Sequence, residues 1–306
     1  MKILITGGTS TIGKHLKSEL SDAIYLSSAD CDLRDSAQTN AMFQQHKPDV
    51  LIHLAAIVGG IQDNIARPVE YLQDNLLINT NSIKAAYDAG TNKIIALSST
   101  CAYPDISNRY PLVEEDVFVG PPAATNFGYA YSKRCMAALL ECYNQQHSTK
   151  YCHIIPSNLY SELDSHKRER AHFVTALLHK IQAAEISGTS TIKLLGTGAP
   201  FRQFTYAGDV ARIIKTMIQN DVYQSFNVSN PEILTINQLA EITLQELGLS
   251  HWNIEYTNPE LDGQYRKDVS INKLRTFFPD FMFTPFANGI KKVYNSIISN
   301  TNRKHG

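Results

Sequence analysis

Cysteine is scarce in this sequence, and the few cysteines form no motif. The 306 residues include five, at positions 31, 101, 135, 142 and 152. They are odd in number and widely spaced, with no C-x-x-C pair, which argues against a disulfide framework or a zinc site. We therefore expect no metal, and free thiols fit a cytoplasmic protein. Cys135 and Cys142 fall on one predicted helix, where we expect them to pack.

Long apolar runs and an excess of charge of one sign are also missing. The net charge is −1, and the basic residues are scattered, which argues against a nucleic-acid partner. No apolar run reaches the ~18–20 residues that a membrane span needs. The short apolar opening leads directly into a glycine turn, so we interpret it as a buried strand rather than a signal segment. The content of 43% hydrophobic and 19% charged residues is that of an ordinary globular protein.

The sequence does contain a regular alternation of predicted strands and helices. Apolar runs predict strands at 2–6, 24–27, 50–54, 93–98 and 151–156. Helical spacing predicts helices at 11–20, 37–45, 68–88, 129–146, 173–184, 236–247 and 285–299. Nearly continuous apolar strands alternating with helices predict an α/β fold with a doubly wound, Rossmann-like parallel sheet covered on both faces.

A smaller second lobe is predicted after residue 157, where the polar stretch 161–170 interrupts the alternation. Segment 204–218 again reads as a strand followed by a helix, so the two lobes interleave. We expect a dinucleotide-binding domain at 1–157 plus about 203–230, and an α/β substrate-binding lobe at about 158–202 plus 231–306.

A glycine-rich turn joins the first predicted strand to the first predicted helix. Its cofactor candidates are Gly7, Gly8, Ser10, Thr11, Ile12 and Gly13. Glycines let a backbone approach a dinucleotide pyrophosphate, and a helix N-terminus favours its charge. A simple tight turn explains two adjacent glycines equally well.

Two further segments fall where the rest of a dinucleotide would lie. Asp32 and Leu33 follow the second strand, where an acidic side chain could meet the adenine amino group. Leu54, Ala55 and Ala56 end the third strand at the carboxyl edge of the sheet, beside a cofactor ribose and pyrophosphate. A solvated loop and a plain buried strand end are the alternatives.

Tyr129 and Lys133 are the most informative pair in the chain. Four residues apart, they share one face of a predicted helix. An ammonium beside a phenol favours the phenolate, so we expect a lowered pKa for Tyr129 and easier proton transfer near neutral pH. Ser99 ends the fourth strand, where it could hydrogen-bond a substrate oxygen or cap a turn.

The order Ser99, Tyr103, Tyr129, Lys133 resembles the extended short-chain dehydrogenase/reductase superfamily over almost the full length. Within it, the chain is similar to the GDP-L-fucose synthase family in three stretches: 53–61, 98–104, and 158–160 followed by 172–178. The resemblance implies 3,5-epimerisation and NADPH-dependent 4-reduction of GDP-4-keto-6-deoxymannose, or of a closely related nucleotide sugar.

The resemblance also implies catalytic roles. Cys101 is the epimerisation base and His172 its acid partner; Tyr129 protonates the C4 oxygen, Lys133 supports it and holds the nicotinamide ribose, and Ser99 hydrogen-bonds the ketone. The C4 ketone acidifies the protons at C3 and C5, and inversion needs groups on both faces of the ring. From spacing alone, an inert packed thiol and a helix-capping or surface histidine remain open.

Other binding residues follow from the same resemblance. Near the cofactor it places Pro156, Asn158 and Leu159, and toward the substrate Asn158, Phe173, Leu195, Arg202 and Lys267. Arg202 and Lys267 match basic residues that meet the sugar-nucleotide diphosphate. Asn75 and Asn79 either fix the loop before the site or are surface amides.

The chain departs from the family around the cofactor. Ser10 stands at a family glycine, which a negative φ would permit. Thr9 and the pair Ser27-Ser28 stand where the family has arginines for the 2′-phosphate of NADP. We expect NADPH, with Lys14 or Arg34 substituting for those arginines, and NADH stays open.

Two rival functions share part of the pattern. An NAD-dependent sugar-nucleotide 4-epimerase or 4,6-dehydratase needs Ser99, Tyr129 and Lys133 but not the pair of Cys101 and His172. A non-catalytic dinucleotide sensor needs no proton donor at all.

A homodimer is expected through the helices 68–88 and 129–146. Ile78, Met136 and Leu140 are apolar there but fall off the core stripes of these helices.

Overall fold

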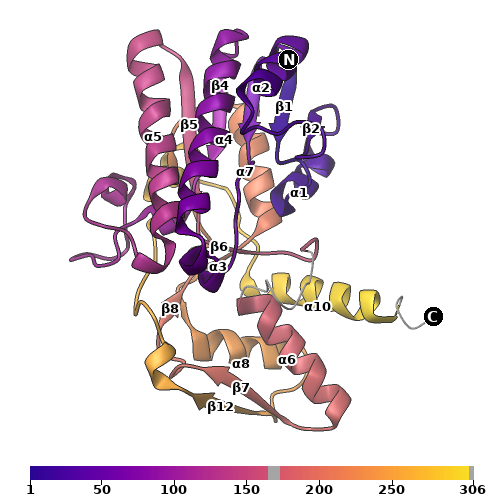
Figure 1. The fold of residues 1–306 in the computed structure, drawn as a ribbon. Coiled ribbons are helices and arrows are strands. Elements are labelled where there is room, and N and C mark those ends of the chain that lie inside the picture. Colours follow the sequence, from indigo (N-terminus) through magenta and orange to yellow (C-terminus); the bar gives the residue numbers. More distant parts are fainter. Residues whose placement is uncertain (165–172, 303–306) are drawn as a thin grey trace.

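The computed structural model describes residues 1–164 and 173–302, and its largest feature is a six-stranded sheet (Figure 1). The spatial order is Phe226–Val228 (β10), Lys150–Pro156 (β5), Lys93–Leu97 (β4), Val50–His53 (β3), Ile3–Thr6 (β1) and Ile24–Leu26 (β2). All of its pairings are parallel. The strand order reverses between β1 and β3, where a doubly wound sheet opens a crevice at its carboxyl edge. The predicted fold class is confirmed.

Helices cover both faces of the sheet. On one face Thr11–Glu19 (α1) packs against Ala207–Gln219 (α7); on the other Pro68–Asp88 (α4) contacts both Ser36–His46 (α2) and Phe127–His147 (α5). Side chains alternate along β1, so Ile5 joins the core under α1 and α7 while Leu4 joins the core under α2, α4 and α5. Both faces are buried, which explains why the strands read as continuous apolar runs.

A separate apolar core lies at the other end of the molecule, low in Figure 1. Three helices build it, Phe173–Ser187 (α6), Ile236–Glu246 (α8) and Phe286–Asn302 (α10), with the parallel pair Thr191–Leu195 (β7) and Asn253–Thr257 (β12).

Short strands, helices and turns complete the described fold. The strand pairs are Asn158–Tyr160 (β6) with Phe204–Tyr206 (β9), and Phe201–Arg202 (β8) with Leu234–Thr235 (β11). The short helices are Ile61–Ala66 (α3), Asn272–Phe277 (α9), and the 3₁₀ turns Thr100–Ala102 (η1), Glu114–Phe118 (η2), Ala124–Asn126 (η3) and Pro259–Leu261 (η5). None of the described helices is long and apolar enough to cross a bilayer.

Two expectations about α4 and α5 are wrong. Ile78, Met136 and Leu140 are only 8%, 1% and 1% exposed, because α4 and α5 pack against each other as well as against the sheet. Their core-facing stripes are therefore wider than one helix face suggests. Conversely, Cys135 and Cys142 do not pack but lie exposed on the outer side of α5.

Candidate active site

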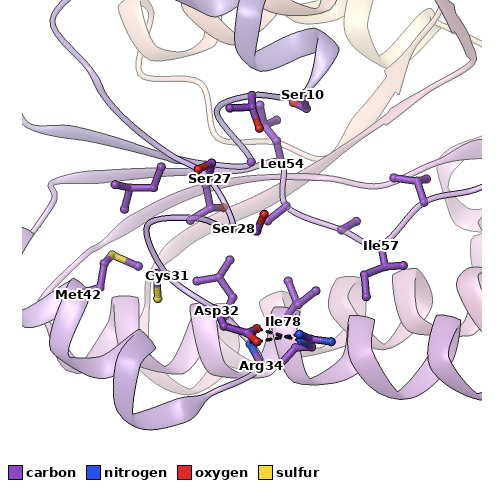
Figure 2. A pocket seen from close by; sticks show the side chains of 18 residues that line it. Ser10, Ser27, Ser28, Cys31, Asp32, Arg34, Met42, Leu54, Ile57 and Ile78 are labelled. Atoms are coloured by element: carbon purple, nitrogen blue, oxygen red, sulfur yellow. Dashed lines mark hydrogen bonds and ion pairs between the residues drawn. The ribbon is translucent and has the colours of Figure 1, made fainter. Parts of the chain in front are cut away.

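A pocket of about 460 Å³ opens where β1, β2 and β3 end (Figure 2). It lies at the carboxyl edge of the sheet, beside the point where the strand order reverses. Seven cofactor residues expected from the sequence line it: Gly7, Ser10, Asp32, Leu33, Leu54, Ala55 and Ala56. Strand ends far apart in the sequence thus form one crevice.

The glycine turn is built for close backbone approach. Gly7 has φ of +71°, and a Cβ added there would lie 2.8 Å from the backbone nitrogen of Ala55. Ser10 has φ of −64°, so a serine fits without strain where the family has a glycine. Its hydroxyl caps α1 by accepting the Gly13 N–H at 3.2 Å. The first turn of a helix has backbone N–H groups with no partner inside the helix, and these residues therefore fit a dinucleotide pyrophosphate.

Several other cofactor candidates are not among the residues that line this pocket. Ile12 is 2% exposed in the core between α1 and α7. The Gly8 N–H donates to the Leu26 carbonyl at 2.7 Å, which holds the turn against β2. The other candidates outside the lining are Thr11, Gly13, Tyr129, Lys133, Pro156, Asn158 and Leu159.

The structure adds further pocket residues, of which Thr9, Ser27, Ser28 and Arg34 had been considered from the sequence only for the 2′-phosphate. Polar side chains come from Thr6, Thr9, Ser27, Ser28 and Arg34, and apolar or sulfur side chains from Leu26, Cys31, Met42, Ile57, Val58 and Ile78. Most of these residues follow directly after β1, β2 or β3. Their position just after a predicted strand is the feature of the sequence that could have identified them as pocket residues. Met42 and Ile78 come from helices, and only the packing of α2 and α4 places them here.

Tyr129 and Lys133 lie buried together on α5. The Lys133 Nζ donates to the Leu97 carbonyl at the end of β4 at 2.7 Å and lies 5.6 Å from the centre of the Tyr129 ring. Burial lowers the pKa of Lys133 to about 8. Burial also raises the pKa of Tyr129, and the neighbouring Cys101 raises it further. The expected lowering of the Tyr129 pKa is therefore wrong for this structure, because burial of the phenol is the largest cause of the shift and disfavours the phenolate.

Cys101 and Ser99 lie in the short turn that follows β4. The Ser99 hydroxyl accepts the Cys101 N–H at 3.2 Å and so begins η1. The Cys101 thiol is half-buried, and the Lys267 ammonium lies 3.9 Å from its sulfur. Tyr103, by contrast, is 2% exposed and donates its hydroxyl to Asn227. Cys101 is thus not turned into the core, and a cation from the far end of the chain reaches it.

A polar network fixes the elements around this turn. The Asn75 amide both accepts the Ile57 N–H and donates to the Ile57 carbonyl, at 2.9 and 3.0 Å. The Asn79 oxygen lies 3.1 Å from His53 Nε2, and Thr6 Oγ1 lies 2.8 Å from His53 Nδ1. Both asparagines are buried, so the surface-amide role is wrong for both. The loop-fixing role holds for Asn75, whereas Asn79 contacts His53 on β3 and the Ser132 carbonyl on α5.

The substrate candidates come from separate elements of the structure. Arg202 donates to the backbone carbonyls of Phe201 and Gln264, both at 2.7 Å, and burial lowers its pKa. Phe173 is half-buried, with its ring centre 5.7 Å from that of Phe204. Leu195 is 57% exposed at the end of β7. His172 lies outside the described residues.

Comparisons with known proteins agree with this geometry. Residues 3–229 match the model of the NAD dependent epimerase/dehydratase family. A probable GDP-L-fucose synthase from Drosophila melanogaster is 32% identical over 319 residues, covering 98% of each chain. A GDP-L-colitose synthase from Yersinia pseudotuberculosis is 35% identical over 255 residues, covering 81% of this chain and 82% of that one. The crystal structure of a GDP-L-fucose synthetase from Naegleria fowleri bound to NADP has a TM-score of 0.87 and 31% identity, covering 98% of this chain and 93% of that one.

Proposed function

This chain belongs to the NAD dependent epimerase/dehydratase family, and from that premise we propose the following reaction. It is an NAD(P)-dependent epimerase and oxidoreductase that converts GDP-4-keto-6-deoxymannose to GDP-L-fucose, or acts in the same way on a closely related GDP-4-keto sugar. The names of the Drosophila and Naegleria relatives support the first substrate. The Yersinia relative is named for a different GDP sugar, so we keep the substrate at the level of this class.

The observation that carries the proposal is a thiol at the reductase site. Cys101 is half-buried in the turn after β4 and close enough to Tyr129 to raise its pKa. Reduction alone needs a proton donor for the ketone, which Tyr129 supplies. A second proton-transfer group beside it serves a step before reduction, and epimerisation next to the ketone is such a step.

The epimerisation step uses Cys101 as base. The thiolate takes the proton from the carbon next to the C4 ketone, the electron pair moves into the enolate, and a proton returns from the opposite face. The Lys267 ammonium, 3.9 Å from the sulfur, stabilises negative charge there. We assign the returning proton to His172 by resemblance. The exchange repeats at the second carbon.

The reduction step uses Tyr129, Lys133 and Ser99. NADPH, when bound in the pocket lined by Gly7, Ser10 and the end of β3, supplies hydride to C4. Tyr129 gives its hydroxyl proton to the C4 oxygen, and Ser99 hydrogen-bonds that oxygen. Lys133 lies beside the Tyr129 phenol and is a cation below about pH 8. It therefore stabilises the negative charge of the phenolate that forms when Tyr129 has given up its proton.

Finer assignments are part of the same proposal. The dinucleotide is bound by 1–157 plus about 203–230 and the sugar nucleotide by about 158–202 plus 231–306, with Asn158, Phe173, Leu195 and Arg202 toward the sugar nucleotide. The protein acts in the cytoplasm as a homodimer, without a nucleic-acid or membrane partner.

The decisive test incubates the protein with GDP-4-keto-6-deoxymannose and NADPH in D₂O and identifies the product by NMR. We expect GDP-L-fucose with deuterium at C3 and C5. Cys101→Ser should lose at least a hundredfold in deuterium incorporation, in line with loss of a general base. Tyr129→Phe should lose a similar factor in reduction but keep the exchange.

Other outcomes of this test would count against the proposal. Unchanged exchange in Cys101→Ser would remove the thiol from the mechanism. Tightly held NAD⁺ in the purified protein, with no net NADPH consumption, would favour the 4-epimerase or 4,6-dehydratase alternative. Cofactor binding without any turnover would favour a sensor.

A further inference from the structure

The end of the pocket beside β2 lies where a doubly wound sheet distinguishes NAD from NADP. In doubly wound sheets, a carboxylate near the end of the second strand binds the ribose 2′-hydroxyl of NAD, whereas an available arginine receives the 2′-phosphate of NADP. Here the pocket at this end is lined by Thr9, Ser27 and Ser28, which carry no charge. Figure 2 shows the two serines near the middle of the view.

Asp30 brings a carboxylate back to this strand end. β2 ends at Leu26, and Asp30 Oδ2 accepts both the Ser27 N–H at 2.8 Å and the Ser27 hydroxyl at 2.7 Å. The chain turns tightly here, because the Asp30 N–H in turn donates to the Ser27 carbonyl. The hydrogen bonds from Ser27 lower the pKa of Asp30, so it is negatively charged at neutral pH. No acidic residue directly follows β2 in the sequence, but the turn brings the Asp30 carboxylate to the residue that does, Ser27.

The cations expected to replace the missing arginines are already engaged. Arg34 is the only cation among the residues described as lining the pocket, and its guanidinium binds Asp32 at 2.9 and 2.8 Å and Asp74 at 3.2 Å. Figure 2 shows the pairing with Asp32. Lys14 does not line the pocket, and its ammonium donates to the Leu163 carbonyl at 2.8 Å. A 2′-phosphate would thus meet no free cation among the residues described as lining the pocket, and the nearby Asp30 carboxylate is bonded to Ser27, which does line it.

We propose that this enzyme does not select for the 2′-phosphate and uses NADH as readily as NADPH. The inference rests on the proposed function for the identity of the cofactor, but it concerns binding alone. An arginine hydrogen-bonded to a phosphate would favour NADPH by about ten- to a hundredfold. A preference for NADPH of this kind is not expected from two neutral serines and a carboxylate, which are what Ser27, Ser28 and Asp30 provide.

The test measures dissociation constants of NADPH and NADH by calorimetry, without any sugar. AMP and adenosine 2′,5′-bisphosphate serve as probes that lack the nicotinamide. We expect each pair to differ by less than about tenfold. A preference for the phosphorylated member of tenfold or more would overturn the proposal.

Two variants test the residues. Ser28→Arg should tighten NADPH at least tenfold and leave NADH unchanged, and Ser28→Gln, which is long but neutral, is its matched control. Asp30→Asn keeps the size of the side chain and removes its charge, so NADPH should tighten while NADH does not. Equal effects of Asp30→Asn on both dinucleotides, or equal effects of Ser28→Arg and Ser28→Gln on NADPH, would contradict the assignment.

The binding result separates this inference from the proposed function. Exclusive binding of NADPH would overturn the inference and leave the epimerase/reductase standing. Equal binding of both dinucleotides with no conversion of the sugar would support the inference and contradict the proposed function. Failure of both dinucleotides to bind would overturn both.

Discussion

At the scale of single residues, Cys101 depends on a side chain that follows it by 166 positions. Lys267 comes from a segment that is hydrogen-bonded to two distant parts of the chain. The Gln264 carbonyl accepts from Arg202, while Leu112 donates its N–H to the Asp268 carbonyl. The resemblance assigns Lys267 to the substrate diphosphate, and the structure places its ammonium at the sulfur. The two roles predict different kinetics.

Lys267→Met should slow deuterium exchange at C3 and C5 by about ten- to a hundredfold at saturating sugar. The reason is the loss of one charged contact at the sulfur when it carries negative charge. NMR exchange rates with Lys193→Met, an exposed lysine on β7, as control would measure this. If only KM rises and the saturated rate stays the same, Lys267 serves the diphosphate instead.

The reduction should lose activity as the pH rises through about 8. Burial depresses the pKa of Lys133 to about 8, so its ammonium is fully present below that pH and is lost above it. A profile of kcat for 4-reduction against pH should therefore have a falling limb near 8. A flat profile up to pH 9.5 would mean that the charge on Lys133 is not needed.

At the scale of elements, α4 and α5 meet where a glycine allows close approach. A Cβ added to Gly128 would lie 2.3 Å from the Pro68 carbonyl oxygen at the start of α4. This contact sets the depth at which α5 packs, and Tyr129 follows directly. The helix itself was predictable from its periodicity, but the contact was not, because it joins residues 60 positions apart.

Gly128→Ala should destabilise the protein by about 1–3 kcal/mol, the usual cost of overpacking. Gly60→Ala is a suitable control, since no atom lies within 4 Å of its added Cβ and its φ is −69°. The control should change stability by about 1 kcal/mol or less. Urea unfolding of both variants would decide, and equal midpoints would show that α5 can shift freely.

At the scale of the whole molecule, two buried histidines link stability to pH. Burial lowers the pKa of His53 and of His153 to about 4, with nearby lysines adding to the effect. Both are neutral in the folded protein at pH 5, whereas in the unfolded chain they titrate near 6.5. The unfolded state then binds more protons between 6.5 and 4, so stability falls as the pH is lowered through this range.

Each histidine should contribute about 1.4 kcal/mol per pH unit within this window. Urea unfolding at pH 7, 6 and 5 measures the slope for the normal chain and for His153→Gln, which removes one of the two groups. The variant should lose stability less steeply. Parallel slopes would show that His153 is protonated in the folded state.

Dimerisation through α4 and α5 remains a prediction, although its original basis is wrong. The residues first invoked are buried within the monomer, whereas Val69, Leu77 and Phe127 on these helices are 64%, 37% and 51% exposed. Light scattering should give twice the mass of the 34.1 kDa chain. A mass of one chain would reject the dimer.

Five of the six sheet strands, the longer helices between them and the turn that carries the pocket were predicted from the sequence, whereas the sixth strand, Phe226–Val228, was not. These follow from local periodicity, and parallel strand ends meet at one edge however the rest of the chain folds. Only the tertiary structure placed Lys267 at Cys101 and raised the pKa of Tyr129 instead of lowering it. Burial decided the pKa, and a contact between distant segments decided the position of Lys267. Both are set by the packing of the folded chain and not by neighbouring residues in the sequence.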